Sequence, residues 1–221
     1  PAQCDGAARP LRAGARRRPM RDYYESVWER LPADLRPPLE QRRRAFLLSH
    51  VQAGDRVLDL GCGDGYFCEV LATAGAEPVG VDVAESALAR ARTRVPATRF
   101  ELVSTDGPLP FAEGEFDAVW SSEVIEHVAD TARWLSELRR VLRREGRALV
   151  TTPRHGRLTG AGIALRGFES RFDPQGEHLR FYTRRSLAAL LGEFGFDDIR
   201  VAGAGALPPA RCTLLASAAR A

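Results

Sequence analysis

The sequence predicts a doubly wound α/β fold with a seven-stranded, mostly parallel sheet and an antiparallel last strand. Short apolar runs alternate with amphipathic segments from residue 56 to residue 194, which is typical of strands joined by helices. A glycine-rich loop directly follows the first apolar run. The last two runs, 196–201 and 211–216, have no helix between them, so we expect them to pair antiparallel.

Two helices are expected ahead of the sheet. Apolar residues recur at helical spacing over 22–31, and a second helix is expected over 40–50, after Pro37 and Pro38. A Rossmann-like alternation of strands and helices follows. The expected strands are 56–60, 78–82, 98–103, 116–120 and 147–152. One expected helix follows the glycine loop and ends near residue 74, and two more span 85–94 and 125–143. Thr183 is expected to cap a last helix that runs to Phe194.

Length and charge limit the class of protein. The 221 residues suit one α/β domain, which we place at 21–221, and no run reaches the roughly 18 apolar residues of a membrane span. Residues 1–20 carry five arginines and one aspartate, a net charge of +4; since the whole chain carries +3, the rest sums to −1. The folded part therefore lacks the basic face of a nucleic-acid binder. Residues 1–20 are expected to form a disordered basic tail, and whether this tail is native stays open.

The cysteines indicate a reducing compartment. The chain has four, Cys4, Cys62, Cys68 and Cys212, which are scattered and form no CxxC pair. No short apolar block behind a basic start reads as a secretory signal. These features are typical of a cytoplasmic protein with reduced thiols.

The strongest local signal is the sequence VLDLGCGDGY over 57–66. Glycines at every second position, Gly61, Gly63 and Gly65, let the backbone turn sharply and approach a ligand where a Cβ would collide. The same loop would also suit a plain strand-to-helix turn. Its spacing is GxGxG, not the GxGxxG of pyrophosphate-binding folds, which favours a ligand without phosphates.

Two further positions favour a nucleoside ligand. Asp82 ends the next strand, 21 residues beyond Gly61, where a carboxylate can accept hydrogen bonds from both ribose hydroxyls. Asp106 and Gly107 follow the third strand, where a side-chain acceptor and a backbone N–H can face an adenine ring. Polar groups at all these strand ends are hard to obtain by chance.

These motifs, VLDLGCGDG, VGVD, TDGPLPF and FDAVWSSEVIEHV in this order, resemble the class I S-adenosylmethionine-dependent methyltransferases. Within that class the chain resembles the bacterial small-molecule group that includes the ubiquinone-biosynthesis O-methyltransferases. The resemblance covers roughly residues 22–218. It implies a methionine end lined by Asp59, Gly61, Cys62 and Gly63, a ribose held by Asp82, an adenine contacted by Val83, Asp106 and Gly107, and a backbone near Ser121 that faces the amino acid part. Tyr23 or Tyr24 would close over the cofactor, although packing in the core explains these tyrosines equally well.

Glu123, Glu126 and His127 form an ExxEH segment. On a helix, residues three and four apart share one face, and the resembling enzymes carry a similar segment that can hold a divalent cation. Carboxylates at a helix N-terminus are favoured without any metal, so we favour no metal and treat His127 as a residue that faces the substrate.

The stretch 153–182 is the least regular and is expected to form a lid over a partly apolar acceptor. His155 and His178 lie in it and, with His127, are the candidate general bases. The expected function is methyl transfer from S-adenosylmethionine to a small molecule, at oxygen by resemblance. An S-adenosylmethionine-binding protein with other chemistry, or with a binding role alone, stays open, as do the acceptor and the oligomeric state.

Overall fold

The structure is a computed structural model that describes residues 20–32, 36–105, 107–155, 179–205 and 212–221. The expected basic tail, Asp106, His178 and most of the expected lid lie outside these ranges.

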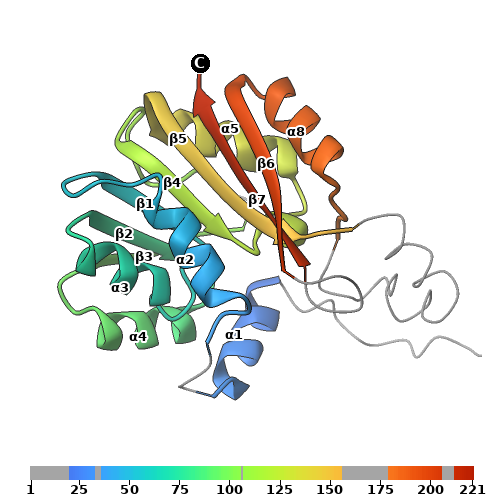
Figure 1. Ribbon diagram of the computed structural model, residues 1–221. Helices are drawn as coiled ribbons and strands as arrows, with labels where there is room; N and C mark the ends of the chain where they lie inside the picture. Colours follow the sequence, from blue (N-terminus) through green and yellow to red (C-terminus); the bar gives the residue numbers. More distant parts are fainter. Residues whose placement is uncertain (1–19, 33–35, 106, 156–178, 206–211) are drawn as a thin grey trace, which may run out of the picture.

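The centre of the fold is a seven-stranded sheet in the order β3-β2-β1-β4-β5-β7-β6 (Figure 1). Its neighbours are parallel from β3 to β5, whereas β7 runs antiparallel to both β5 and β6. The predicted fold class, with an antiparallel last strand, is therefore confirmed. The strands are β1 Arg56–Leu60, β2 Glu77–Asp82, β3 Arg99–Leu102, β4 Phe116–Ser122, β5 Leu142–Pro153, β6 Phe196–Gly205 and β7 Cys212–Arg220.

Helices cover both faces of the sheet. They are α1 Met20–Arg30, α2 Glu40–Leu48, α3 Tyr66–Thr73, α4 Glu85–Arg94, α5 Thr131–Val141 and α8 Arg184–Glu193. On one face, Leu47 of α2 and Phe67 of α3 pack with Trp120 in a buried cluster. On the other, Leu138 of α5 and Leu187 of α8 belong to the larger cluster. Because both faces are covered, the inner strands are buried over most of their length, as in β1, where four of five residues are buried.

The last helix begins as predicted. The Thr183 hydroxyl accepts a hydrogen bond from the Ser186 backbone N–H at 3.1 Å, and the Ser186 hydroxyl accepts in turn from the Thr183 N–H at 2.9 Å. This capping box satisfies backbone donors that the first turn of α8 leaves without partners.

The expected single helix over 125–143 is wrong. Ile125–His127 form one turn of 3₁₀ helix, η1, and α5 begins only at Thr131. The break occurs because Val128 is extended and the Asp130 side chain accepts from the Arg133 N–H at 3.0 Å, as an N-cap does. Glu123 has φ +58° and lies outside any helix, so the argument that the ExxEH residues share a helical face fails.

Among the described residues, no helix has the length and apolar character needed to cross a membrane.

Candidate active site

A pocket of about 390 Å³ opens where β1, β2, β3 and β4 end. This is the edge at which open α/β sheets bind ligands. Segments far apart in the sequence form its walls: Tyr24, Val27, Trp28 and Leu31 from α1, Gly61 and Gly63 after β1, Asp82 and Val83 at the end of β2, Ser104, Thr105 and Gly107 after β3, and Ser122, Glu123, Val124 and His127 after β4. Of the predicted site residues, the pocket brings together Gly61, Gly63, Asp82, Val83, Gly107 and His127.

The glycine loop is fixed by its own backbone. The N–H groups of Gly61 and Cys62 both donate to the Val81 carbonyl at 2.9 Å, and the Gly63 N–H donates to Oδ2 of Asp82 at 2.9 Å. Gly61 and Gly63 have φ values of +84° and +53°, in the left-handed region that favours glycine. A Cβ on Gly63 would lie 2.6 Å from the Trp28 ring. The loop therefore needs glycine for its backbone conformation and for the close approach of α1.

Asp82 lies at the pocket wall and is 8% exposed. Its second oxygen, Oδ1, accepts from the Ala84 N–H at 3.0 Å. Burial raises the pKa of Asp82 above its ordinary value, and its backbone hydrogen bonds offset only part of this effect. Because each carboxylate oxygen can accept more than one hydrogen bond, both retain capacity toward the pocket.

Three predicted cofactor residues, Asp59, Cys62 and Ser121, are buried and do not line the pocket. Asp59 accepts from the Cys68 thiol at 3.4 Å, and burial raises its pKa to about 7. The Ser121 hydroxyl donates to the Leu60 carbonyl at 2.9 Å, which ties the ends of β4 and β1 together. These side chains support the pocket wall from behind.

Helix α1 is held beside α4, at the lower end of the molecule in Figure 1. The Glu25 carboxylate accepts from the N–H groups of Glu85 and Ser86 at 2.7 and 3.0 Å, at the start of α4. The Arg90 side chain donates to the Leu31 carbonyl at 2.8 Å. Tyr24 lines the pocket, whereas its neighbour Tyr23 does not.

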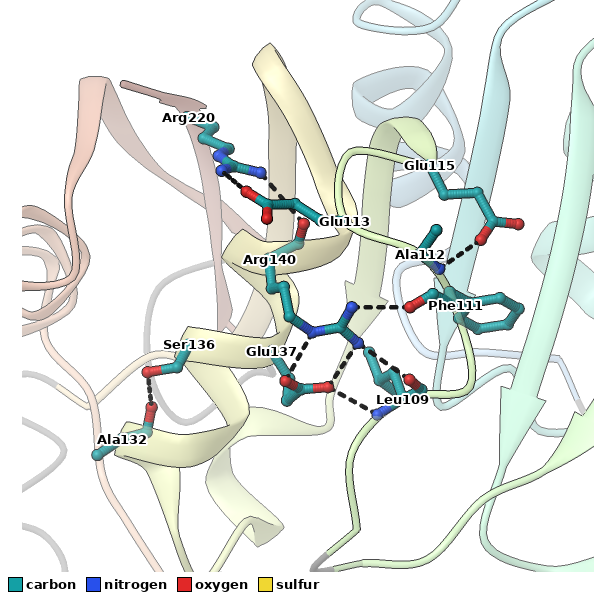
Figure 2. A network of polar contacts seen from close by, with 10 residues as sticks. All are labelled: Leu109, Phe111, Ala112, Glu113, Glu115, Ala132, Ser136, Glu137, Arg140 and Arg220. Carbon is teal, nitrogen blue, oxygen red and sulfur yellow. Dashed lines mark hydrogen bonds and ion pairs between the residues drawn. The ribbon is translucent and has the colours of Figure 1, made fainter.

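The wall next to β3 is held by an arginine that the sequence analysis missed (Figure 2). Arg140 donates to both carboxylate oxygens of Glu137 at 2.8 Å and to the carbonyls of Phe111 and Leu109 at 2.7 and 3.0 Å. Glu137 also accepts from the Leu109 N–H at 2.7 Å. Leu109 and Glu137 line the pocket, so this network fixes the segment that follows Gly107. Only the i, i+3 spacing of Glu137 and Arg140 could have signalled the pair.

A second missed residue, Arg43 of α2, is 3% exposed and lies 3.0 Å from Oε1 of Glu123. The hydroxyls of Thr151 and Thr213 donate to the same oxygen at 3.2 and 3.0 Å. Glu123 is therefore held in an ion pair with Arg43. No sequence signal identified Arg43, because it is one of three consecutive arginines.

Glu126 and His127 lie side by side after β4. Glu126 is 1% exposed and accepts from the Thr152 hydroxyl at 3.0 Å. Burial and the nearby charge of Glu123 raise its pKa to about 8. Nε2 of His127 lies 3.8 Å from Oε1 of Glu126, and the Tyr24 ring meets the imidazole edge to face, with centroids 6.1 Å apart. Within the described part of the chain, no group of three or more His, Cys, Asp or Glu side chains could hold a metal ion.

The other two candidate bases have different positions. His155 does not line the pocket. Its ring packs against Phe181, with centroids 4.6 Å apart, and its backbone N–H donates to the Tyr182 carbonyl. His178 lies outside the described residues. Of the three histidines, the structure therefore brings His127 to the pocket.

A family model described as a methyltransferase domain matches residues 20–201. The chain belongs to this family. Its fold and its relatives identify it as a class I S-adenosylmethionine-dependent methyltransferase domain. The resemblance drawn from the sequence motifs is confirmed.

Curated relatives give the same assignment. A probable S-adenosylmethionine-dependent methyltransferase of Mycobacterium tuberculosis is 34% identical over 148 residues, which are 66% of this chain and 50% of the relative. A ubiquinone biosynthesis O-methyltransferase of a Ruegeria species is 35% identical over 154 residues, 66% of this chain and 62% of the relative. The chain thus spans about half to two thirds of the length of these relatives.

Solved structures with low sequence identity share the fold. A putative methyltransferase of Bacillus halodurans superposes with a TM-score of 0.67 at 16% identity, covering 81% of this chain and 99% of that one. Phosphoethanolamine N-methyltransferase 2 of Haemonchus contortus, in complex with S-adenosyl-L-methionine, gives a TM-score of 0.63 at 16% identity and covers 81% and 52%.

The contact between Gly63 and Trp28 can be tested with a matched pair of substitutions. Gly63→Ala places a Cβ 2.6 Å from the Trp28 ring at φ +53°, whereas Gly54→Ala introduces a left-handed alanine (φ +88°) with nothing within 4 Å. We expect Gly54→Ala to lower the free energy of unfolding by about 1–2 kcal/mol and Gly63→Ala by a further 1–3 kcal/mol or so. Urea unfolding followed by circular dichroism measures both, and equal losses would contradict the contact.

The raised pKa of Asp59 predicts a dependence of stability on pH. The pKa is about 7 in the folded protein against an ordinary value of 3.8, so the unfolded chain loses this proton first and wild-type stability falls as pH rises between these values. Asp59→Asn removes the cost of ionising the buried group. We expect its free energy of unfolding, relative to wild type, to be more favourable at pH 8 than at pH 4.5. The exposed Asp197→Asn serves as the control; a difference that does not change with pH would be inconsistent with a raised pKa.

Proposed function

We propose that this protein transfers the methyl group of S-adenosylmethionine to an oxygen atom of a small, partly apolar acceptor. One observation carries the proposal: a single pocket is lined both by Gly61, Gly63 and Asp82 and by His127. Groups suited to a nucleoside and a group suited to proton transfer therefore share one enclosed space.

The pocket fits the cofactor at its β1 and β2 side. Gly61 and Gly63 form a backbone cradle that a Cβ would fill, and the Asp82 carboxylate can accept from ribose hydroxyls in addition to its two backbone donors. Val83 and Gly107 would contact the adenine; Asp106, expected to do the same, lies outside the described residues. Asp59, Cys62 and Ser121 would not contact the cofactor directly. They would support the glycine loop and the strand ends that line the pocket.

The relatives and the pocket lining favour oxygen and an apolar acceptor. One relative is a ubiquinone biosynthesis O-methyltransferase, and the pocket contains Val27, Leu31, Val124, Val128 and Trp134. Apolar walls with a few polar groups are typical of sites that bind small organic molecules.

S-adenosylmethionine supplies a methyl group already activated for in-line attack. The chain aligns the acceptor and excludes water, which for well-oriented reactants contributes up to roughly 7–11 kcal/mol. His127 takes the proton of the acceptor hydroxyl. With the donor bound, the acceptor oxygen would bond to the methyl carbon as the carbon–sulfur bond breaks, and the electron pair of that bond would stay on sulfur. Proton transfer of this kind contributes typically about 10²–10⁴-fold.

The role of Asp82 can be tested without knowing the acceptor. We expect S-adenosylhomocysteine, the product of the donor, to bind at micromolar concentration and Asp82→Ala to weaken this binding by tenfold or more, because two ribose hydroxyls lose their acceptor. Isothermal titration calorimetry measures both, with the exposed Asp197→Ala as the control. Unchanged binding by Asp82→Ala would remove Asp82 from the cofactor site.

The acceptor chemistry can be tested with a matched panel of alkyl-substituted phenols, catechols and anilines and methyl-labelled S-adenosylmethionine. We expect label on the hydroxyl compounds, and His127→Gln should lower kcat by roughly 10²–10⁴-fold with little change in KM for the donor. His50→Gln, at the end of α2 away from the pocket, is the control. Label on the anilines alone would indicate an amine acceptor, and bound donor with no product from any compound would favour a binding role.

A further inference from the structure

Glu126 is a buried carboxyl that the mechanism above does not use. Its Oε2 accepts from the Thr152 hydroxyl at 3.0 Å. Its Oε1 is also buried and has no hydrogen-bond partner among the described residues. A buried polar oxygen without a partner costs free energy, so a native one requires a physical reason.

The reason lies in the neighbouring residue. Oε1 of Glu126 is 3.8 Å from Nε2 of His127, which lines the pocket. The carboxyl is held in place, because Thr152 fixes Oε2 and the Glu126 carbonyl accepts from the N–H groups of Leu179 and Arg180 at 2.8 and 3.2 Å. A fixed carboxyl beside one ring nitrogen can set the orientation and the tautomer of an imidazole.

The two glutamates of the ExxEH segment have different surroundings. Glu123 is paired with Arg43 at 3.0 Å and accepts from two threonine hydroxyls. Glu126 has one threonine hydroxyl and the imidazole. Burial and the charge of Glu123 raise the pKa of Glu126 to about 8, so this carboxyl ionises close to the range in which histidine changes charge.

We propose that Glu126 is a positioning residue that orients the ring of His127 and, in its ionised form, stabilises the imidazolium as His127 takes the acceptor proton. The inference rests on the proposed function only in giving His127 the role of base. Catalytic triads use a buried carboxylate beside an imidazole in the same way. The titratable and charged groups that face the pair from the described elements are Tyr24 on α1, Arg43 on α2, Glu123 ahead of η1, and Arg180 and Tyr182 ahead of α8.

Two groups this close titrate as a coupled pair. The ring signals of His127 should therefore show two inflections with pH, one for the imidazole and a second near pH 8 for Glu126. Glu126→Gln should abolish the second inflection, because the variant has no carboxyl to titrate beside the ring. Thr152→Val should move the second inflection to higher pH, because the Thr152 hydrogen bond lowers the pKa of Glu126.

The experiment is an NMR titration of the histidine rings in the full chain with bound S-adenosylhomocysteine. The chain has only four histidines, so His127→Gln assigns the signal, and the rings of His50 and His155 are internal controls that should not change. Glu126→Gln removes a buried ionisable group and is expected to fold; Thr152→Val tests the same coupling independently. A His127 titration that is the same in wild type and in both variants overturns the proposal.

Turnover separates this inference from the proposed function. With a hydroxyl acceptor from the panel, we expect Glu126→Gln to lower kcat about tenfold, to leave KM for the donor unchanged and to remove the inflection near pH 8 from the pH profile of kcat. Loss of a packing role alone would not remove that inflection. If the NMR coupling is present but His127→Gln retains full kcat, the base assignment fails and the pairing of Glu126 with His127 stands.

Discussion

The site depends on the way in which the glycine loop is tied to the end of β2. Two successive N–H groups, of Gly61 and Cys62, share the Val81 carbonyl, and the next residue donates to the Asp82 carboxylate. For these consecutive N–H groups to point toward the end of β2, the backbone must turn sharply. Gly61 and Gly63 allow the turn because they adopt positive φ values. The same contacts hold the Asp82 carboxylate at the pocket wall, so the shape of the loop and the position of the acid are a single constraint.

The same constraint involves α1, which precedes every strand of the sheet in the sequence and forms a wall of the pocket. Trp28 lies where a side chain on Gly63 would have to be. Glu25 satisfies the first N–H groups of α4, at the end of the helix where a negative charge is favoured. Because α4 directly follows β2, the helix that covers the pocket and the strand that carries Asp82 are linked through one short segment.

Much of the fold and part of the site could be predicted from the sequence. Strand periodicity and the GxGxG spacing depend on neighbouring residues, so the sheet, the glycine loop and the position of Asp82 could be predicted. Pairing between residues far apart in the sequence could not be predicted. Arg43 looks like any arginine of a solvated helix until α2 packs against the sheet beside Glu123. The break before α5 was missed because the apolar pattern continues through it, while the Asp130 cap decides the helix start.

The carboxyl edge of the sheet concentrates acidic groups, and the structure surrounds them differently. Asp82 accepts from two backbone N–H groups, and Glu123 is paired with Arg43. Glu126 lies beside the His127 ring and is more deeply buried, and because burial raises its pKa to about 8, its proton is retained to higher pH. Separate surroundings for adjacent carboxyl groups are how one site can hold a fixed negative charge and an exchangeable proton at the same pH. Here the surroundings differ between Asp82, which accepts from backbone N–H groups at one side of the pocket, and Glu126, which lies beside His127 at the other.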